Sequence, residues 1–336
     1  MRLKKRFVLS MVLCLACFAF GLGIGNFYGN QIIDLVRPVK LRTYPDLTGF
    51  SIESLIIREP YTSNIEIIET LSENTDSTSY LVKFATQASK NDTVKHVSGL
   101  LNLPKKTGSF PLVLLIRGYV DQSLYQTGVG TRKVGDFFAA NGFMTVSPDY
   151  LGYGQSSSQS SNIFQTRFET YTTTIDLISS LKSLDRWDQK NVFIWAHSNG
   201  GQIALASLEA VGKTVPTCLW APVSKPFPYS VLYYTDESQD NGKYIRQELA
   251  KFEEYHDSNL FSPDAYLDKI NSPLLIHQGG RDDAVPKSWS DILVAKLTKL
   301  AKSVRYTTYP EADHNMNPNW TEAVSADLEF FTSYMR

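Results

Sequence analysis

Residues 192–208 read VFIWAHSNGGQIALASL and decide the fold of this 336-residue chain. The opening apolar run is typical of a strand buried on both faces of a parallel sheet, and residues 202–211 have the spacing of a helix. Ser198 falls in the tight turn between them, with the small residues Ala196 and Gly200 two positions away on either side. A nucleophilic serine in such a strained turn needs small neighbours, because larger ones would collide with the strand and the helix. The alternative is an ordinary turn with a serine near a helix cap.

Strands and helices alternate on both sides of this stretch. Buried strands are predicted at 111–116, 143–147, 192–196, 217–221, 273–277 and 304–309, and helices at 132–141, 168–184, 202–211, 288–301 and 320–334. This alternation predicts an α/β fold, with a mainly parallel central sheet and helices on both faces. Further upstream, four short runs predict antiparallel strands at the amino-terminal edge of the sheet: 51–58, 65–71, 80–86 and 94–103.

Residues 222–268 interrupt the alternation without a clear strand and are rich in phenylalanine and tyrosine. An insertion at this point of the chain would overhang the predicted nucleophile, so a small lid or cap that walls the substrate is one interpretation. The other is a helical excursion whose aromatic stripe packs onto the body. Both can hold together.

Composition and charge exclude several classes of protein. With 43% hydrophobic and 20% charged residues, the chain has enough apolar surface to bury a core. Its net charge of −1 is uneven, because four basic residues lie within the first six. The rest holds 29 basic against 34 acidic residues, which argues against a nucleic-acid partner. Cys218 is the only cysteine of this body, so no internal disulfide can form there.

Residues 7–25 carry no charge and follow the basic cluster. As a helix they would span about 28 Å, close to the hydrocarbon core of a membrane. We therefore predict a signal anchor or transmembrane segment at 1–25, a stalk or linker at 26–50, and a catalytic domain at 51–336 outside the cytoplasm. A cleaved secretion signal, a lipoprotein signal ending at Cys17 and a buried helix are the alternatives.

Two later strand ends supply an acid and a histidine. The strand at 273–277 runs into Asp282 and Asp283, and the strand at 304–309 runs into His314. The carboxyl ends of parallel strands meet at one edge of a sheet, where Ser198 is also expected. In this architecture the acid and the histidine follow the serine along the chain, as they do here. His314 would accept the serine proton, and Asp282 would hold the imidazole; Asp283 is the alternative acid.

Further motifs carry a resemblance to a known family. The run 147–156, SPDYLGYGQS, is similar to a D-x-x-G-x-G-x-S strand end, and G-x-x-D-x-x-V-P extends from Gly279 to Pro286. Together with 185–188 and 266–273, they make the chain resemble the α/β-hydrolases over about 51–336. The likeness is to the catalytic domain of the prolyl oligopeptidase family and its dienelactone-hydrolase-like relatives. The family register favours Asp282 as the acid.

The resemblance implies a serine hydrolase that works through an acyl-enzyme and cleaves small peptides. A carboxylesterase acting on small acyl esters is the alternative, and a noncatalytic membrane-anchored binding protein on the same scaffold is a candidate of another class. Backbone N–H groups of Asn199 and Tyr119 would form the oxyanion hole. Arg117 departs from the family's pattern and is interpreted as a structural ion pair or a ligand of a substrate carboxylate. His197 and His277 are interpreted as packing or supporting groups. No metal or cofactor is expected, since no cluster has metal-ligand spacing.

Overall fold

The computed structural model describes residues 44–88, 92–235 and 238–336. The predicted signal anchor at 1–25, and the predicted stalk up to residue 43, lie outside the described residues. Among the helices that are described, none has the length and apolar character needed to cross a membrane. The membrane segment and the location it implies therefore stay predictions.

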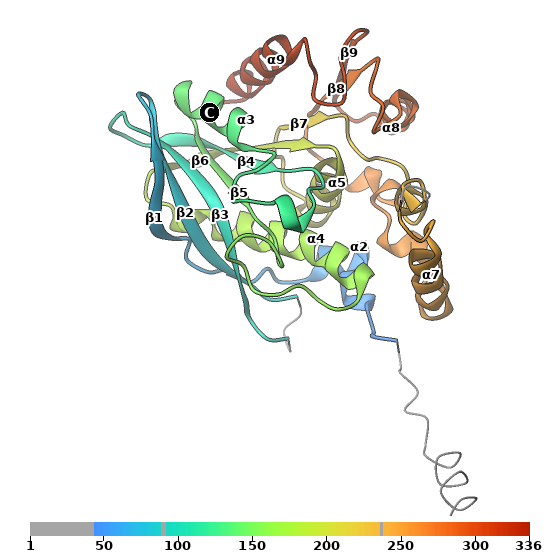
Figure 1. Ribbon diagram of the computed structural model, residues 1–336. Coiled ribbons are helices and arrows are strands. Elements are labelled where there is room, and N and C mark those ends of the chain that lie inside the picture. The colour runs from blue at the N-terminus through green and yellow to red at the C-terminus, as the bar shows by residue number, and fades with distance from the viewer. Residues whose placement is uncertain (1–43, 89–91, 236–237) are drawn as a thin grey trace, which may run out of the picture. The chain divides into compact units, whose positions relative to one another are not determined.

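A single sheet forms the centre of the folded unit, Asp46–Arg336 (Figure 1). Within the described residues its strand order is β1-β2-β3-β5-β4-β6-β7-β8-β9. The strands are β1 (Glu66–Glu73), β2 (Ser77–Thr86), β3 (Lys95–Pro104), β4 (Phe110–Ile116), β5 (Met144–Pro148), β6 (Trp187–His197), β7 (Thr217–Trp220), β8 (Leu274–Gly279) and β9 (Val304–Tyr309). Neighbours from β5 to β9 pair in parallel, and β1, β2, β3 and β5 pair antiparallel. The mainly parallel sheet with antiparallel amino-terminal strands is confirmed.

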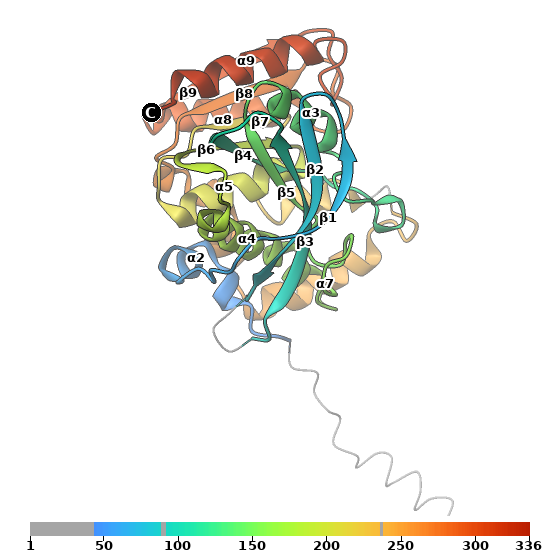
Figure 2. The ribbon, with the colours of Figure 1, turned by 90° about the vertical axis from the view of Figure 1, so that its left-hand side faces the viewer.

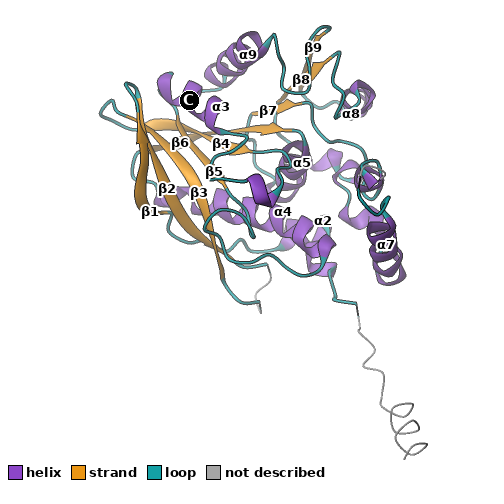
Figure 3. Ribbon diagram, viewed as in Figure 1, coloured by secondary structure: helices purple, strands orange, loops and turns teal. Residues whose placement is uncertain are grey.

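Helices cover both faces of this sheet. The α-helices are α2 (Ile52–Ile57), α3 (Arg132–Ala140), α4 (Ile163–Ser180), α5 (Asn199–Val211), α6 (Tyr229–Leu232), α7 (Lys243–Tyr255), α8 (Lys287–Lys299) and α9 (Trp320–Ser333). Two views show α3 and α9 on one face and α2, α4 and α5 on the other (Figures 1 and 2). Strands and helices alternate from β4 onward, as Figure 3 shows by colour.

The central strands are buried because they carry apolar side chains on both faces. In β4 every residue from Leu112 to Ile116 is at most 1% exposed. Toward α3 and α9, Phe193 of β6 stacks on Phe331 with ring centroids 4.8 Å apart. Burying one such side chain stabilises the fold by about 1.5–3 kcal/mol. The β4–β6 register pairs Ile116 with Ala196, so the chain leaves both strands at the same level, directly before Gly118 and Ser198.

One predicted strand is wrong. Within residues 51–58, Ile52–Ile57 form helix α2, because the Ser51 side chain accepts a hydrogen bond from the N–H of Ser54 and caps the helix. Ile52 and Leu55, three residues apart, are its buried side chains. The compact unit spans Asp46–Arg336, and Leu47 within it is 1% exposed; the division into anchor, stalk and catalytic domain stays a prediction.

The described residues of the insertion at 222–268 form helices joined by turns and contain no strand, and its phenylalanines pack onto the body. Phe227, Phe252 and Phe261 are fully buried against Phe168 of α4, with ring centroids 4.8–6.0 Å apart. Its tyrosines at 229, 233, 244 and 255 are exposed. The packing interpretation is confirmed, whereas the role of a lid stays a prediction.

Candidate active site

Ser198 occupies a strained turn between β6 and α5. Its backbone has φ 57° and ψ −124°, a conformation that a residue with a side chain rarely adopts and that costs about 1–3 kcal/mol. Surrounding hydrogen bonds hold it: the Ser198 N–H donates to the Trp220 carbonyl at 2.9 Å, and the Ser198 carbonyl accepts from Gly201 and Val223, each at 2.9 Å. The predicted strand-turn-helix with serine at its tip is therefore present.

Small residues are required around this turn because the end of β4 and the segment after β7 pass so close to it. A Cβ added to Gly200 would lie 2.3 Å from the Ile116 carbonyl oxygen, and one added to Gly201 would lie 2.4 Å from the Pro222 side chain. Both glycines lie inside α5, which begins at Asn199 and not at 202 as predicted. The close approach of helix and strand outweighs the low helix propensity of glycine.

Asp282 and His314 lie together beyond β8 and β9. The Nδ1 of His314 lies 3.0 and 2.9 Å from Oδ1 and Oδ2 of Asp282, whose side chain is fully buried. Since a carboxylate only accepts, Nδ1 carries the hydrogen and Nε2 is left free to accept a proton. Asp283 is exposed, and Asp313 binds the N–H groups of its own loop at Asn315 and Asn317. Of the two acids that the sequence left open, the structure pairs Asp282 with the histidine.

The Asp282 carboxylate is kept ionised. Burial raises its pKa, but hydrogen bonds from His314 and from the N–H of Val285 (2.8 Å) and Ala284 (3.0 Å) outweigh burial and lower the pKa below its usual value. A charged Asp282 is the form that can stabilise an imidazolium at His314.

Sequence reasoning missed Gln278, which precedes the acid on β8. It is fully buried, and its Nε2 donates to Asp282 Oδ2 at 3.0 Å and to the Val285 carbonyl at 3.3 Å. The Ser290 hydroxyl donates to its Oε1 at 2.7 Å, which fixes the orientation of the amide. The only signal in the sequence for a buried polar contact at this position was a glutamine within the mainly apolar run LLIHQG, which forms β8.

His197 supports the loop that carries His314. Its Nε2 donates to the His314 carbonyl at 2.9 Å, and the two rings lie 4.6 Å apart. Burial first, and then the nearby His314, lower the pKa of His197 to about 4, so its imidazole is neutral near neutral pH. The prediction of a supporting group fits these contacts.

The loop after β4 lies against the serine. A Cβ on Gly118 would be 3.0 Å from Ser198 Cβ and 3.5 Å from Oγ, so only glycine leaves room there for a substrate oxygen. Asn199 begins a helix, and its N–H therefore lacks an intrahelical acceptor. The Tyr119 side chain is 75% exposed, so its backbone N–H is the donor that we consider for the oxyanion hole. The oxyanion hole at Tyr119 and Asn199 stays a prediction, as does the complete Ser198–His314–Asp282 triad. Among the described contacts no hydrogen bond joins Ser198 to His314, a link that often forms only in the substrate complex.

Arg117 is surrounded by aromatic rings, and no acid among the described residues forms an ion pair with it, which corrects the expected ion pair. The guanidinium donates to the carbonyl oxygens of Gly118 and Asp149, each at 2.9 Å. Its Cζ lies 4.2–5.5 Å from the ring centroids of Tyr125, Tyr150 and Tyr153. Cation–π contacts of this kind compensate a buried positive charge.

His277 serves the fold at a second, fully buried site. Its Nε2 lies 2.9 Å from Asp327 Oδ1, and its Nδ1 lies 3.0 Å from the Tyr309 hydroxyl. Trp220 Nε1 donates to the other Asp327 oxygen at 2.8 Å. The prediction of a packing or supporting role for His277 agrees with this network.

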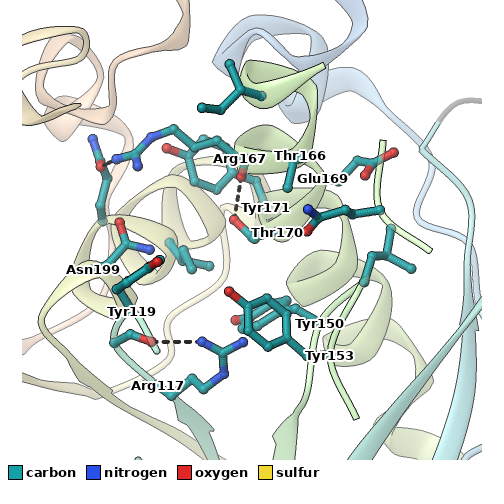
Figure 4. A pocket seen from close by; sticks show the side chains of 16 residues that line it. Arg117, Tyr119, Tyr150, Tyr153, Thr166, Arg167, Glu169, Thr170, Tyr171 and Asn199 are labelled. Atoms are coloured by element: carbon teal, nitrogen blue, oxygen red, sulfur yellow. Dashed lines mark hydrogen bonds between the residues drawn. The ribbon is translucent and has the colours of Figure 1, made fainter. Parts of the chain in front are cut away.

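A cavity of about 200 Å³ opens beside the strained turn at Ser198, which we call the elbow (Figure 4). Gly118, Tyr119 and Asn199 lie at its edge, and residues of α4 form another wall. Tyrosine, threonine and arginine side chains line much of it. No described residue of the 222–268 insertion contributes to this lining.

Comparison with known proteins identifies the family. The model of the prolyl oligopeptidase family matches residues 131–336, which include the elbow, Asp282 and His314. The chain belongs to the prolyl oligopeptidase family. As a member of this family, the protein is a serine hydrolase, either a peptidase or an esterase. A noncatalytic binding protein is thereby set aside.

Relatives of this prolyl oligopeptidase family member include both kinds of enzyme. The acetyl esterase Axe7A of Xylanibacter ruminicola is 25% identical over 257 residues, which cover 67% of this chain and 53% of the relative. The chain thus spans about half the length of that relative. An acetyl xylan esterase structure from Paenibacillus has a TM-score of 0.62 at 17% identity and covers 88% of this chain and 96% of its own. The acylaminoacyl peptidase of Pyrococcus horikoshii has a TM-score of 0.52 at 14% identity, covering 82% and 50%. Both likenesses establish the α/β-hydrolase fold.

Proposed function

We propose that this protein is a carboxylesterase that hydrolyses esters of short acyl groups through an acyl-enzyme on Ser198. The observation that carries the proposal is the His314–Asp282 pair, whose imidazole presents a free Nε2 at the same sheet edge as the strained serine. The fixed tautomer makes His314 a proton acceptor for a hydroxyl that is otherwise a poor nucleophile.

The reaction follows from these positions. Ser198 Oγ attacks the ester carbonyl while His314 Nε2 takes its proton, and the oxyanion is stabilised by the N–H groups of Asn199 and Tyr119. Collapse breaks the bond to the alcohol, which leaves with the proton from His314. Water then attacks the acyl-enzyme with the same proton transfers and releases the acid. Asp282 holds the imidazole and stabilises its positive charge in both halves.

Two observations favour an ester over an amide. The cavity beside the oxyanion residues has a volume of about 200 Å³, which suits a short acyl group and not an extended peptide. The acetyl xylan esterase structures align over 95–96% of their own length, whereas the acylaminoacyl peptidase aligns over half of its length.

A serine peptidase is the second candidate. It is favoured by the family model itself, and by a Bacillus subtilis relative, described as an uncharacterized peptidase, that is 25% identical over 240 residues. An amide needs stronger protonation of its leaving group than an ester does, so the two substrate types separate the candidates directly.

A fluorophosphonate probe tests the serine. The native protein should take up one label, Ser198→Ala should take up none, and Ser207→Ala on the same helix should label as the native protein does. Turnover of 4-nitrophenyl acetate should then exceed turnover of aminoacyl and prolyl 4-nitroanilides. Absence of labelling in the native protein would overturn the proposed chemistry, and faster cleavage of the anilides would identify a peptidase.

A further inference from the structure

Three residues that line the cavity beside Ser198 carry buried donor atoms for which the described protein supplies no acceptor. Within the described residues, Nε of Arg117, Nε of Arg167 and the O–H hydrogen of Tyr171 have no acceptor, although the Arg167 guanidinium lies close enough to donate to the Tyr171 oxygen; all three residues line the cavity. Tyr171 is 1% exposed, so water outside the protein does not satisfy its hydroxyl. Figure 4 shows Arg167 and Tyr171 together on one wall and Arg117 near Tyr119 and Tyr153. Leaving such groups unpaired is costly, which points to a ligand that accepts their hydrogens.

The cavity also carries positive charge that the protein does not neutralise. Glu169, which lines it, pairs with Lys95 at 2.9 Å. Arg117 is compensated by carbonyl oxygens and tyrosine rings. Arg167 donates to the uncharged side-chain oxygen of Gln202 and lies within hydrogen-bond reach of the Tyr171 hydroxyl, and within the described residues it forms no ion pair with a carboxylate. The Arg167 guanidinium is therefore the charge that a ligand would complement.

Donors without acceptors, next to an unpaired guanidinium, match a carboxylate best. A carboxylate accepts through both oxygens and fits the planar fork of arginine, whereas a neutral hydroxyl accepts more weakly and must also place its own hydrogen. We propose that Arg167 and Tyr171 bind a carboxylate on the substrate, so that the enzyme acts on acyl groups ending in an acid. The inference rests on the proposed function, since it names the substrate class of that same site.

The carboxylate belongs to the acyl part of the substrate, not to its leaving group. His314 protonates the leaving group, which must therefore lie toward the 309–317 loop, and that loop contributes no residue to the cavity lining. Gln202, which accepts from Arg167, lies three residues after Asn199 on helix α5, a rise of about 4.5 Å. Arg167 is therefore bound about one helical turn beyond the proposed oxyanion hole. A volume of about 200 Å³ holds about seven water-sized atoms. A short chain such as a succinyl or glutaryl group fills this space.

Two esters that differ in one charge test the proposal. Monoethyl glutarate carries the carboxylate, and ethyl 5-oxohexanoate replaces it with a neutral acetyl group of the same size. The native enzyme should favour the glutarate in kcat/KM by at least tenfold. Arg167→Met should abolish this preference, while Arg305→Met, which removes an exposed arginine on β9, should retain it. Acetyl-glutamate and acetyl-glutamine 4-nitroanilides, which differ by the same charge, measure whether the enzyme prefers an acidic acyl group in an amide substrate as well.

Protection from the fluorophosphonate probe needs no variant and covers the case in which Arg167→Met does not fold. Glutarate should slow labelling of the native protein at concentrations where glutaramide does not. Equal protection by both compounds, or native rates within twofold for the charged and neutral esters, would overturn the carboxylate site. Labelling at Ser198 with no charge preference refutes only this inference, whereas absence of labelling refutes the proposed function beneath it.

Discussion

Exchanging Asp282 for asparagine tests how the acid fixes the proton on His314. Oδ1 accepts two backbone N–H groups, from Ala284 and Val285, so the amide oxygen of asparagine must take this place. The NH2 group then takes the place of Oδ2, 2.9 Å from His314 Nδ1 and 3.0 Å from Gln278 Nε2. Because NH2 donates, it can bond only to an Nδ1 without hydrogen. The proton of His314 moves to Nε2, and the imidazole can no longer accept the serine proton.

The magnitude follows from the wrong tautomer and from the new contact with Gln278. A histidine locked in this form lowers kcat by about 10⁴-fold in a serine triad, which corresponds to about 5.4 kcal/mol of transition-state stabilisation. The introduced NH2 group also faces the NH2 group of Gln278, which leaves buried donors unpaired. The free energy of unfolding should therefore fall by about 1–3 kcal/mol as well.

The assay is turnover of 4-nitrophenyl acetate by Asp282→Asn, compared with Asp283→Asn at the exposed neighbouring position. Urea unfolding of both variants gives the stability difference. We expect a loss near 10⁴-fold in the first variant and less than threefold in the second. An Asp282→Asn enzyme within tenfold of the native rate would refute the argument from hydrogen-bond polarity.

Three further substitutions follow from the same contacts. Gly118→Ala places a methyl group 3.0 Å from Ser198 Cβ, and kcat/KM for 4-nitrophenyl acetate should fall at least 100-fold without loss of the folded circular dichroism spectrum; retained activity would contradict the tight fit. Ser290→Ala deprives the buried Gln278 Oε1 of its donor and should lower the free energy of unfolding in urea by about 1–3 kcal/mol; an unchanged midpoint would contradict this. Glu209 is 2% exposed with both oxygens unpaired, and burial, reinforced by Asp264 and Asp268, raises its pKa well above the usual value. The folded state therefore holds this proton more tightly than the unfolded chain, and native stability falls by about 1.4 kcal/mol per pH unit above the ordinary glutamate range until the folded carboxyl ionises. Glu209→Gln removes this slope, so its advantage should vanish near pH 4 and grow as the pH rises, whereas parallel stability curves would contradict the assignment.

Strong local patterns predicted the parallel half of the fold. The runs at 192–196 and 273–277 are apolar on both faces, and a strand is the only short element that buries such a run between helices. Residues 51–58 misled because their three isoleucines have high strand propensity. The capping serine and the spacing of Ile52 and Leu55 were the contrary signal.

The residues of the candidate site were predictable where the chemistry requires a particular residue type. They were not predictable where contacts between distant parts of the chain determine the arrangement. Ser198, Asp282 and His314 follow from their order and their strand ends. The cage around Arg117 joins β4 to the segment after β5, and Arg167 meets Gln202 from a different helix. No spacing along the chain indicates such meetings, because they depend on how the two layers pack.

The hydrogen bonds of the elbow also determine how the molecule opens. The Ser198 N–H bonds to the Trp220 carbonyl, the Val223 N–H bonds back to the Ser198 carbonyl, and the Ala221 N–H reaches the His277 carbonyl at 2.8 Å. These amides join three central strands, so deuterium should replace their hydrogens only when the whole sheet separates. Strand β1, exposed at every residue, should exchange through local fraying. Ser198 therefore lies in the part of the molecule that opens last, and the sheet edge can fluctuate without disturbing it.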